Sequence, residues 1–78
     1  MNITKHAFDR MKELGMTTDM LAALMKGRTL VRTGHDGRSV IIGKADGKIW
    51  AVILDADYYT VVTVRRAHED EEDLWTSM

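Results

Sequence analysis

Two places in the chain carry side chains that could act on a phosphate ester. His6 and Arg10 are four residues apart in a segment with helical hydrophobic spacing, so they would share one helix face. A histidine gives or takes a proton near neutral pH, and an arginine holds a phosphate through two parallel hydrogen bonds. Thr63 and Arg65 alternate in a β-branched run, so they would share one strand face and could also bind a phosphate. These groups indicate RNA cleavage by attack of the 2′-hydroxyl. A solvated helix with Arg10 paired to Glu13, and a strand face kept soluble by Arg65, explain the same residues without any chemistry.

Further candidate substrate contacts lie in one predicted turn and at the start of the last predicted strand. His35 and Arg38 belong to a glycine-containing turn, and turns often carry binding residues. Glycine and aspartate are also common in turns for conformational reasons alone. Tyr58 and Tyr59 are adjacent, so in a strand they would point to opposite faces and at most one would be buried. The exposed one, which we take to be Tyr59, could stack on a base.

The acidic residues gather near the C-terminus. Five of the twelve form the run Glu69-Asp70-Glu71-Glu72-Asp73, which leaves seven acidic residues against eleven Lys and Arg in residues 1–68. A mildly basic body is compatible with RNA binding and equally with an ordinary surface. The acidic run is either a solvated tail or a mimic of a nucleic-acid backbone that engages a basic cleft on another protein. In the second case Trp75 would be an apolar anchor, and Asp55 and Asp57 would add contacts.

The sequence gives no sign of a metal or a cofactor. It contains no cysteine, and His6, His35 and His68 are not at metal-ligand spacing. There is no phosphate-binding glycine loop and no Gly-x-Ser-x-Gly motif. The N-terminus lacks the features of a signal peptide, and the apolar runs are far shorter than a membrane span. We therefore expect a cytoplasmic protein that needs no cofactor and contacts no membrane.

The N-terminal part predicts two short helices. Residues 5–14 have apolar side chains at helical spacing, with Thr4 as N-cap and Gly15 just past the end. Residues 19–26 form the second helix, begun by a threonine cap and ended by Gly27. The linker is short, so the two helices form an αα-hairpin. The residues expected to face the core are Ala7, Phe8, Met11, Leu14, Met20, Leu21, Leu24 and Met25.

After Gly27 the hydrophobic period changes from helical to alternating. Four strands are predicted at residues 29–33, 39–42, 49–54 and 58–66. Asp46-Gly47 is a strong hairpin signal. In the last strand a period of two puts Val61 on the same face as Thr63 and Arg65.

The expected fold is α+β, with two N-terminal helices packed on a four-stranded antiparallel meander. Residues 1–67 form this single domain. Residues 68–78 are an acidic tail that could form a helical turn, with Leu74 and Trp75 docked on the body.

The opening Ile3-Thr4-Lys5-His6-Ala7-Phe8-Asp9-Arg10-Met11-Lys12-Glu13-Leu14-Gly15-Met16 resembles the start of a family of small bacterial and phage proteins of largely unassigned function. That family shows a His and an Arg four apart on the first helix and a last strand with a Val-Thr-Val-Tyr/Arg-like run, here Val62-Thr63-Val64-Arg65. It is similar in layout to the RelE/BrnT-like ribonuclease toxins of the barnase–EndoU–colicin–RelE group. The resemblance implies metal-independent RNA cleavage between a helix pair and a sheet, by His6, Arg10, Thr63 and Arg65. The chain departs from active toxins in its weakly basic body and acidic tail.

Three functions follow as hypotheses. The first is a ribonuclease of toxin type, which would act on RNA and be held by an antitoxin. The second is a non-enzymatic inhibitor, encoded by a phage, that binds a nucleic-acid-binding defence complex through its acidic surface. The third is a structural module that forms a homodimer, because 78 residues give a marginal core and an exposed edge strand can pair with a second copy.

Overall fold

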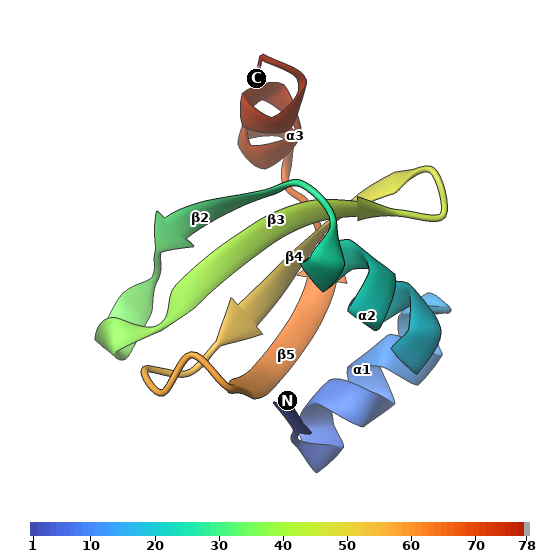
Figure 1. Cartoon of the computed structure of the whole chain (residues 1–78), viewed down its shortest axis with the longest axis vertical. Helices are drawn as coiled ribbons and strands as arrows, with labels where there is room; N and C mark the ends of the chain where they lie inside the picture. Colours follow the sequence, from blue (N-terminus) through green and yellow to red (C-terminus); the bar gives the residue numbers. More distant parts are fainter. Residues whose placement is uncertain (78) are drawn as a thin grey trace.

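The computed structural model describes residues 1–77 as three α-helices and a five-stranded mixed sheet (Figure 1). In chain order the elements are β1 (Asn2–Ile3), α1 (Lys5–Leu14), α2 (Thr18–Lys26), β2 (Thr29–Thr33), a 3-10 turn (His35–Gly37), β3 (Ser39–Ala45), β4 (Lys48–Leu54), β5 (Thr60–Arg66) and α3 (Glu69–Thr76). The α+β class predicted from the sequence is confirmed. The described chain has one strand and one helix more than the two helices and four strands that we expected.

Side-chain caps set the ends of the first two helices. Thr4 Oγ1 accepts a hydrogen bond from the N–H of Ala7, and Gly15 ends α1 in the left-handed region with a φ of 78°. Thr17 Oγ1 accepts from the N–H of Met20, so Thr17 is the N-cap of α2 and the helix begins one residue before the expected start. These caps confirm the predicted end of α1 and the short linker between the two helices.

The strands are ordered β1-β5-β4-β3-β2, and every neighbouring pair is antiparallel except β1 with β5. The meander from β2 to β5 is therefore as predicted. The parallel strand β1 was not predicted, so the purely antiparallel four-stranded sheet is wrong. The N–H of Asn2 donates to the Tyr59 carbonyl, and the N–H of Thr4 donates to the Val61 carbonyl. Two residues are too few to show an alternating pattern, so the sequence carries no signal for this strand.

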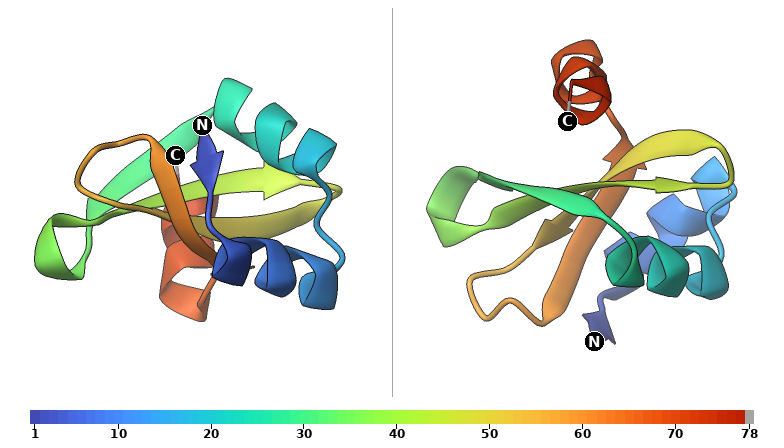
Figure 2. Two further views of the ribbon diagram at one scale, coloured as in Figure 1. Left: turned by 90° about the horizontal axis from the view of Figure 1, so that it is seen from below. Right: turned by 45° about the horizontal axis from the view of Figure 1, so that its top comes forward.

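The helices lie on both faces of the sheet. α1 and α2 cover one face, and α3 lies against the other (Figure 2, right). The core under α1 and α2 consists of buried apolar side chains from both layers: Ala7, Met11, Met16, Leu21, Leu24, Ile41, Ala45, Trp50, Val52, Leu54, Val61 and Val64. Of the residues expected to face the core, Phe8 is largely exposed, and Leu14, Met20 and Met25 are partly buried against it.

A β-bulge in β5 changes which side chains share a face. Leu54 pairs with Val61 whereas Ile53 pairs with Thr63, so β5 has one extra residue at this point. Val61 and Val64 are therefore both fully buried in the core under α1 and α2. The predicted sharing of one face by Val61, Thr63 and Arg65 is wrong for Val61, because the bulge interrupts the period of two.

The acidic segment is an ordered helix rather than a tail. α3 has eight residues, and Trp75 is only 8% exposed, whereas Leu74 is 44% exposed. The guanidinium of Arg28 lies 4.3 Å from the centroid of the Trp75 ring, and its Nη2 donates to the Trp75 carbonyl. Of the two residues expected to dock, Trp75 packs against the body and Leu74 points away.

Gly43 is the point where β3 approaches α2 most closely. A Cβ on Gly43 would lie 2.7 Å from Leu24 Cδ2 and 2.8 Å from Leu24 Cγ. We expect Gly43→Ala to destabilise the fold by about 2 kcal/mol, because Leu24 is buried and has little room to move. Urea unfolding of the single and double variants measures this. In the Leu24→Ala background the same change should cost almost nothing, and an equal cost in both backgrounds would contradict the contact.

Candidate functional site

The predicted catalytic pair on α1 is exposed and internally paired. His6 is exposed on the surface of α1, and Arg10 is at the border of burial and exposure. Arg10 Nη1 lies 2.8 Å from Glu13 Oε2, one turn further along the same helix. This is the solvated, ion-paired helix face that the sequence offered as the alternative to a catalytic one. His6, Arg10 and Glu13 still place an imidazole, a guanidinium and a carboxylate on neighbouring turns.

The structure does not bring Thr63 and Arg65 to α1. Thr63 is opposite Ile53 and Arg65 is opposite Ala51, whereas Val64 between them is in the core that α1 and α2 cover. Because successive side chains of a strand point to opposite faces, Thr63 and Arg65 lie on the face turned away from α1. The four residues of the proposed ribonuclease site are therefore divided between two sides of the sheet.

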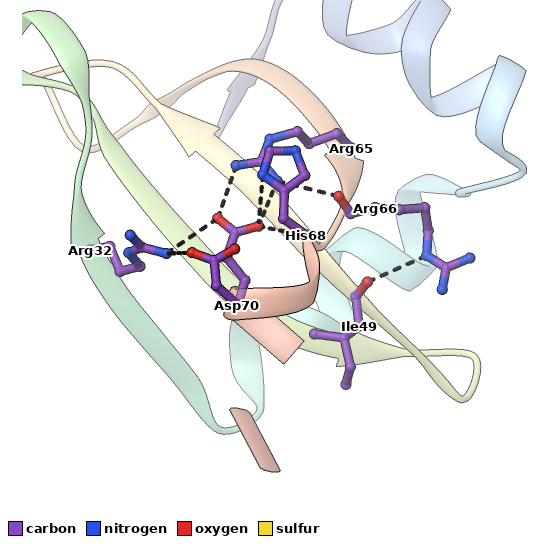
Figure 3. A network of polar contacts seen from close by, with 7 residues as sticks. Arg32, Ile49, Arg65, Arg66, His68 and Asp70 are labelled. Atoms are coloured by element: carbon purple, nitrogen blue, oxygen red, sulfur yellow. Dashed lines mark hydrogen bonds and ion pairs between the residues drawn. The ribbon is translucent and has the colours of Figure 1, made fainter. Parts of the chain in front are cut away.

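Arg65 is held by a buried carboxylate of α3 (Figure 3). Its Nη1 donates to Glu71 Oε1 at 2.6 Å, and its Nη2 donates to Glu71 Oε2 at 2.9 Å. Glu71 is only 3% exposed and also accepts a hydrogen bond from the N–H of His68 at 2.8 Å. This two-point pairing is the strong form of an arginine–carboxylate contact. Arg65 is thus engaged within the protein rather than open to a phosphate.

Arg32 belongs to the same network and lies on β2, the edge strand at the opposite side of the sheet from β1. Its Nη1 lies 3.2 Å from Asp70 Oδ2 and 3.8 Å from Glu71 Oε2. The sequence did not single out Arg32 or Arg28, since isolated arginines in a strand and a loop have no motif around them. Arg32 and Arg28 make their contacts only because α3 folds back toward them, and no local sequence pattern predicts that long-range contact. Two of the five carboxylates in the acidic run, those of Asp70 and Glu71, are therefore in ion pairs within the chain.

Hydrogen bonds from the Arg65 guanidinium lower the pKa of Glu71 to about 2, against the opposing effect of burial. The His68 N–H and the positive charge of Arg65 act in the same direction as those hydrogen bonds. The ionised form of Glu71 is therefore the one that holds α3 on the sheet. Glu71 and Trp75, which we expected to contact a partner, are instead buried structural residues.

The other residues predicted to contact a substrate are His35, Arg38 and Tyr59, which lie in the β2–β3 and β4–β5 turns. A Cβ on Gly37 would lie 3.6 Å from Ala56 Cβ, so the β2–β3 turn and the β4–β5 turn touch. This contact puts the turn that carries His35 and Arg38 beside the turn that carries Tyr59 (Figure 1). Both Tyr58 and Tyr59 are exposed, and β5 begins at Thr60 rather than at Tyr58 as predicted.

Asp55 and Asp57, the other expected partner contacts, belong to this β4–β5 turn and have different roles. Asp57 Oδ1 accepts hydrogen bonds from the N–H groups of Tyr59 and Thr60, and its Oδ2 accepts from Thr60 Oγ1. The bond from the Thr60 hydroxyl, with the two N–H bonds, lowers the pKa of Asp57. Asp57 therefore shapes the turn, and the half-buried Asp55 also contributes, because its Oδ1 accepts a hydrogen bond from the N–H of Ala56 at 2.9 Å.

A shallow apolar hollow lies between α1 and the start of α2. It measures about 480 Å³, and Phe8, Met11, Lys12, Gly15, Met16, Thr17 and Thr18 line it. Its lining is almost wholly apolar, and Lys12 is the one charged residue among those that form it. No histidine or carboxylate is among the described residues that line the hollow, so it does not extend the His6 site.

Comparison with family models, with curated proteins and with solved structures finds no match for this chain. The resemblance to the toxin-like family therefore stays a prediction. Within residues 1–77, no three His, Cys, Asp or Glu side chains gather as a metal site would require. No helix in the same range has both the length and the apolar character needed to cross a membrane.

The Glu71 contacts predict a specific loss of stability in acid. The folded-state pKa of about 2 is below the usual value of 4.5, so the stabilisation is complete above about pH 5 and disappears as the pH falls toward 2. Because Arg65 remains partly exposed, we expect Glu71→Gln to lower the free energy of unfolding by about 2 kcal/mol at pH 7 and to flatten its pH dependence below pH 5. Urea unfolding between pH 7 and pH 2.5 measures both effects.

Asp73→Asn is the matched control for this experiment, because Asp73 is an exposed carboxylate on the same helix. It should leave the stability at pH 7 and the pH profile close to those of the parent. A Glu71→Gln chain that is as stable as the parent at pH 7 would show that the buried pair does not hold α3.

Proposed function

We propose that the chain is a non-enzymatic binding domain that engages the basic surface of a nucleic-acid-binding protein through α3. The proposed contact, which we term the acidic face, comprises Glu69, Glu72 and Asp73. Glu69 and Asp73 are exposed and Glu72 is half-buried, while Asp70 and Glu71 fasten the helix to the sheet. The domain would compete with DNA or RNA for its partner and so act as an inhibitor.

The observation that carries this proposal is the pairing of the arginines that an RNA would need. Arg65 is bound to Glu71, Arg32 to Asp70, and Arg10 to Glu13. These pairs reduce the positive charge available for a phosphate backbone. The acidic face, in contrast, makes no ion pair with any residue described in the structure. The charge left available on α3 is negative, and this favours a cationic partner.

The order of α3 also supports binding. Residues three and four apart on a helix have neighbouring side chains, so Glu69, Glu72 and Asp73 form one compact group of carboxylates. A helix that is already docked loses less conformational entropy on binding than a free tail would lose. Leu74 is exposed on the same helix and adds an apolar contact. Electrostatic attraction would then set the rate of encounter, and the apolar contact would slow dissociation.

Removal of charge from the acidic face tests this function. We expect the variant Glu69→Gln/Glu72→Gln/Asp73→Asn to recover at least about fivefold less partner than the parent chain, since each screened carboxylate contributes a few tenths of a kcal/mol. The measurement is quantitative mass spectrometry of proteins retained by the immobilised chain from a nuclease-treated bacterial extract. Each retained protein is then purified and tested for competition between the chain and a duplex DNA or RNA.

A control variant removes the same charge elsewhere. Asp9→Asn/Asp19→Asn/Asp46→Asn changes three exposed carboxylates outside α3 and should retain the partner as the parent does. Equal losses with both variants would mean that net charge, rather than the acidic face, determines retention. A partner that binds nucleic acid and the chain at the same time would rule out the inhibitor.

A ribonuclease centred on α1 is the second candidate, favoured by the one helix face that His6, Arg10 and Glu13 share. In this form Glu13 or His6 would exchange the protons and Arg10 would bind the phosphate, without Arg65. If the candidate is correct, the purified chain cleaves RNA in EDTA, and His6→Ala lowers the rate at least about 100-fold. Lys5→Ala, one residue away on α1, is the control for a general loss of basic charge. Intact RNA after incubation with the parent chain would remove this candidate.

A further inference from the structure

The β4–β5 turn displays two adjacent tyrosines at the end of the sheet away from α3 (Figure 1). Tyr58 is 72% exposed and Tyr59 is 57% exposed. Neither ring contributes to the core that α1 and α2 cover. Two successive residues with large, exposed aromatic side chains are unusual on a small domain, and exposed tyrosines are enriched in contact surfaces.

The backbone at Tyr58 is held in a conformation that disfavours a bulky side chain. Its φ is 57°, in the left-handed region, where residues other than glycine, asparagine and aspartate are uncommon. The other two non-glycine residues with positive φ are Asp36 and Asp46, which tolerate it well. A tyrosine at this position therefore weakens the fold relative to asparagine, and its exposed ring brings no burial in return.

Hydrogen bonds make the turn rigid. The three contacts of the Asp57 carboxylate, at 2.9, 2.9 and 2.7 Å, fix the backbone of Tyr59 and Thr60. The N–H of Tyr58 donates to the Asp55 carbonyl at 3.0 Å, which closes the turn. A tyrosine on a rigid backbone has only two side-chain torsions to order, so it binds at a low entropic cost.

The charges beside the tyrosines indicate what they would bind. Asp55 and Asp57 are in the same turn, and Asp36 is in the β2–β3 turn that touches it. Arg38 is the one cationic side chain of residues 34–38 and 55–59 apart from His35. Aromatic rings beside carboxylates suit a guanidinium, which stacks on the ring and forms two hydrogen bonds with the carboxylate.

We propose that the Tyr58–Tyr59 turn is a docking surface for an arginine-bearing segment of a protein partner. This inference goes beyond the function proposed for α3, because the two surfaces lie at different ends of the sheet and use different residues. Tyr58 and Tyr59 supply the stacking faces. Asp36 supplies a carboxylate, and Asp55 supplies its Oδ2, since its Oδ1 accepts from the N–H of Ala56. The ring of Tyr58 thus has its role outside the fold, which accounts for a side chain that the backbone conformation disfavours.

Tyr58→Asn separates a binding role from a structural one. Asparagine tolerates the left-handed conformation, so we expect the melting temperature to rise by about 3 °C while binding weakens. The probe is a fluorescein-labelled nona-arginine peptide, titrated with the full chain in 0.15 M salt and followed by fluorescence anisotropy. We expect Kd to increase at least about fivefold in Tyr58→Asn and to change less than about twofold in Tyr58→Phe, which keeps the ring. A nona-lysine peptide should bind more weakly than nona-arginine, because an ammonium does not stack as a guanidinium does.

The variant Glu69→Gln/Glu72→Gln/Asp73→Asn distinguishes the two surfaces. Because the acidic face also attracts a polycation, the Tyr58→Asn and Tyr58→Phe comparisons are made in this background, where the limits of about fivefold and about twofold on Kd apply to the turn alone. The proposal is overturned if the chain with the α3 substitutions shows no saturable binding of nona-arginine, or if adding Tyr58→Asn to that chain leaves its Kd unchanged. Because α3 has lost its exposed charges in this background, neither outcome bears on the partner proposed for α3.

Discussion

The buried carboxylate of Glu71 is the contact on which the position of α3 depends. A charged group that is removed from water must find partners, and Glu71 finds the guanidinium of Arg65 and the N–H of His68. Arg32 of β2 lies near the same carboxylate, so ion pairs connect both β2 and β5 to α3. Once Glu71 is fixed, the direction of α3 is fixed, and Trp75 is placed beneath Arg28. The same constraint determines which carboxylates of the acidic run point outward.

This constraint changes the electrostatic character of the chain from what its sequence indicates. In the sequence, residues 1–68 are mildly basic and the acidic run follows them as a separate segment. In the folded chain the run lies against two of the basic residues, and ion pairs with Asp70 and Glu71 make Arg32 and Arg65 less available to an external anion. The positive charge near α3 is thereby reduced, and exposed carboxylates of α3 lie beside it. The inhibitor hypothesis gains from this folding, because the carboxylates are ordered before a partner arrives.

Local patterns predicted what is local in this fold. Thr4 and Gly15 mark the ends of α1, and Asp46-Gly47 marks the β3–β4 hairpin, because each depends on hydrogen bonds or dihedral angles within a few residues. The parallel strand β1 and the bulge at Val62 depend instead on contacts between distant segments, and neither leaves a periodic trace. The bulge has the larger consequence for the candidate site. It brings Val61 and Val64 into the core and leaves Thr63 and Arg65 on the opposite face, away from His6 and Arg10.

The two ends of the sheet show how a chain of this size divides its polar and aromatic residues between folding and contact. In α3, Glu71 and Trp75 are buried and stabilise the fold, whereas exposed residues beside them can contact a partner. At the β4–β5 turn, Asp57 is consumed by the turn, and the adjacent Tyr58 and Tyr59 remain available. In both places a buried or fully bonded carboxylate holds a short segment rigid, and the exposed neighbours gain a fixed geometry from it. A small domain has few residues that can stabilise it, so one carboxylate that holds a whole segment leaves the neighbouring side chains free to make other contacts. The left-handed conformation of Tyr58 fits this arrangement, because hydrogen bonds accepted by Asp55 and Asp57 hold the turn, and its exposed side chain takes no part in them.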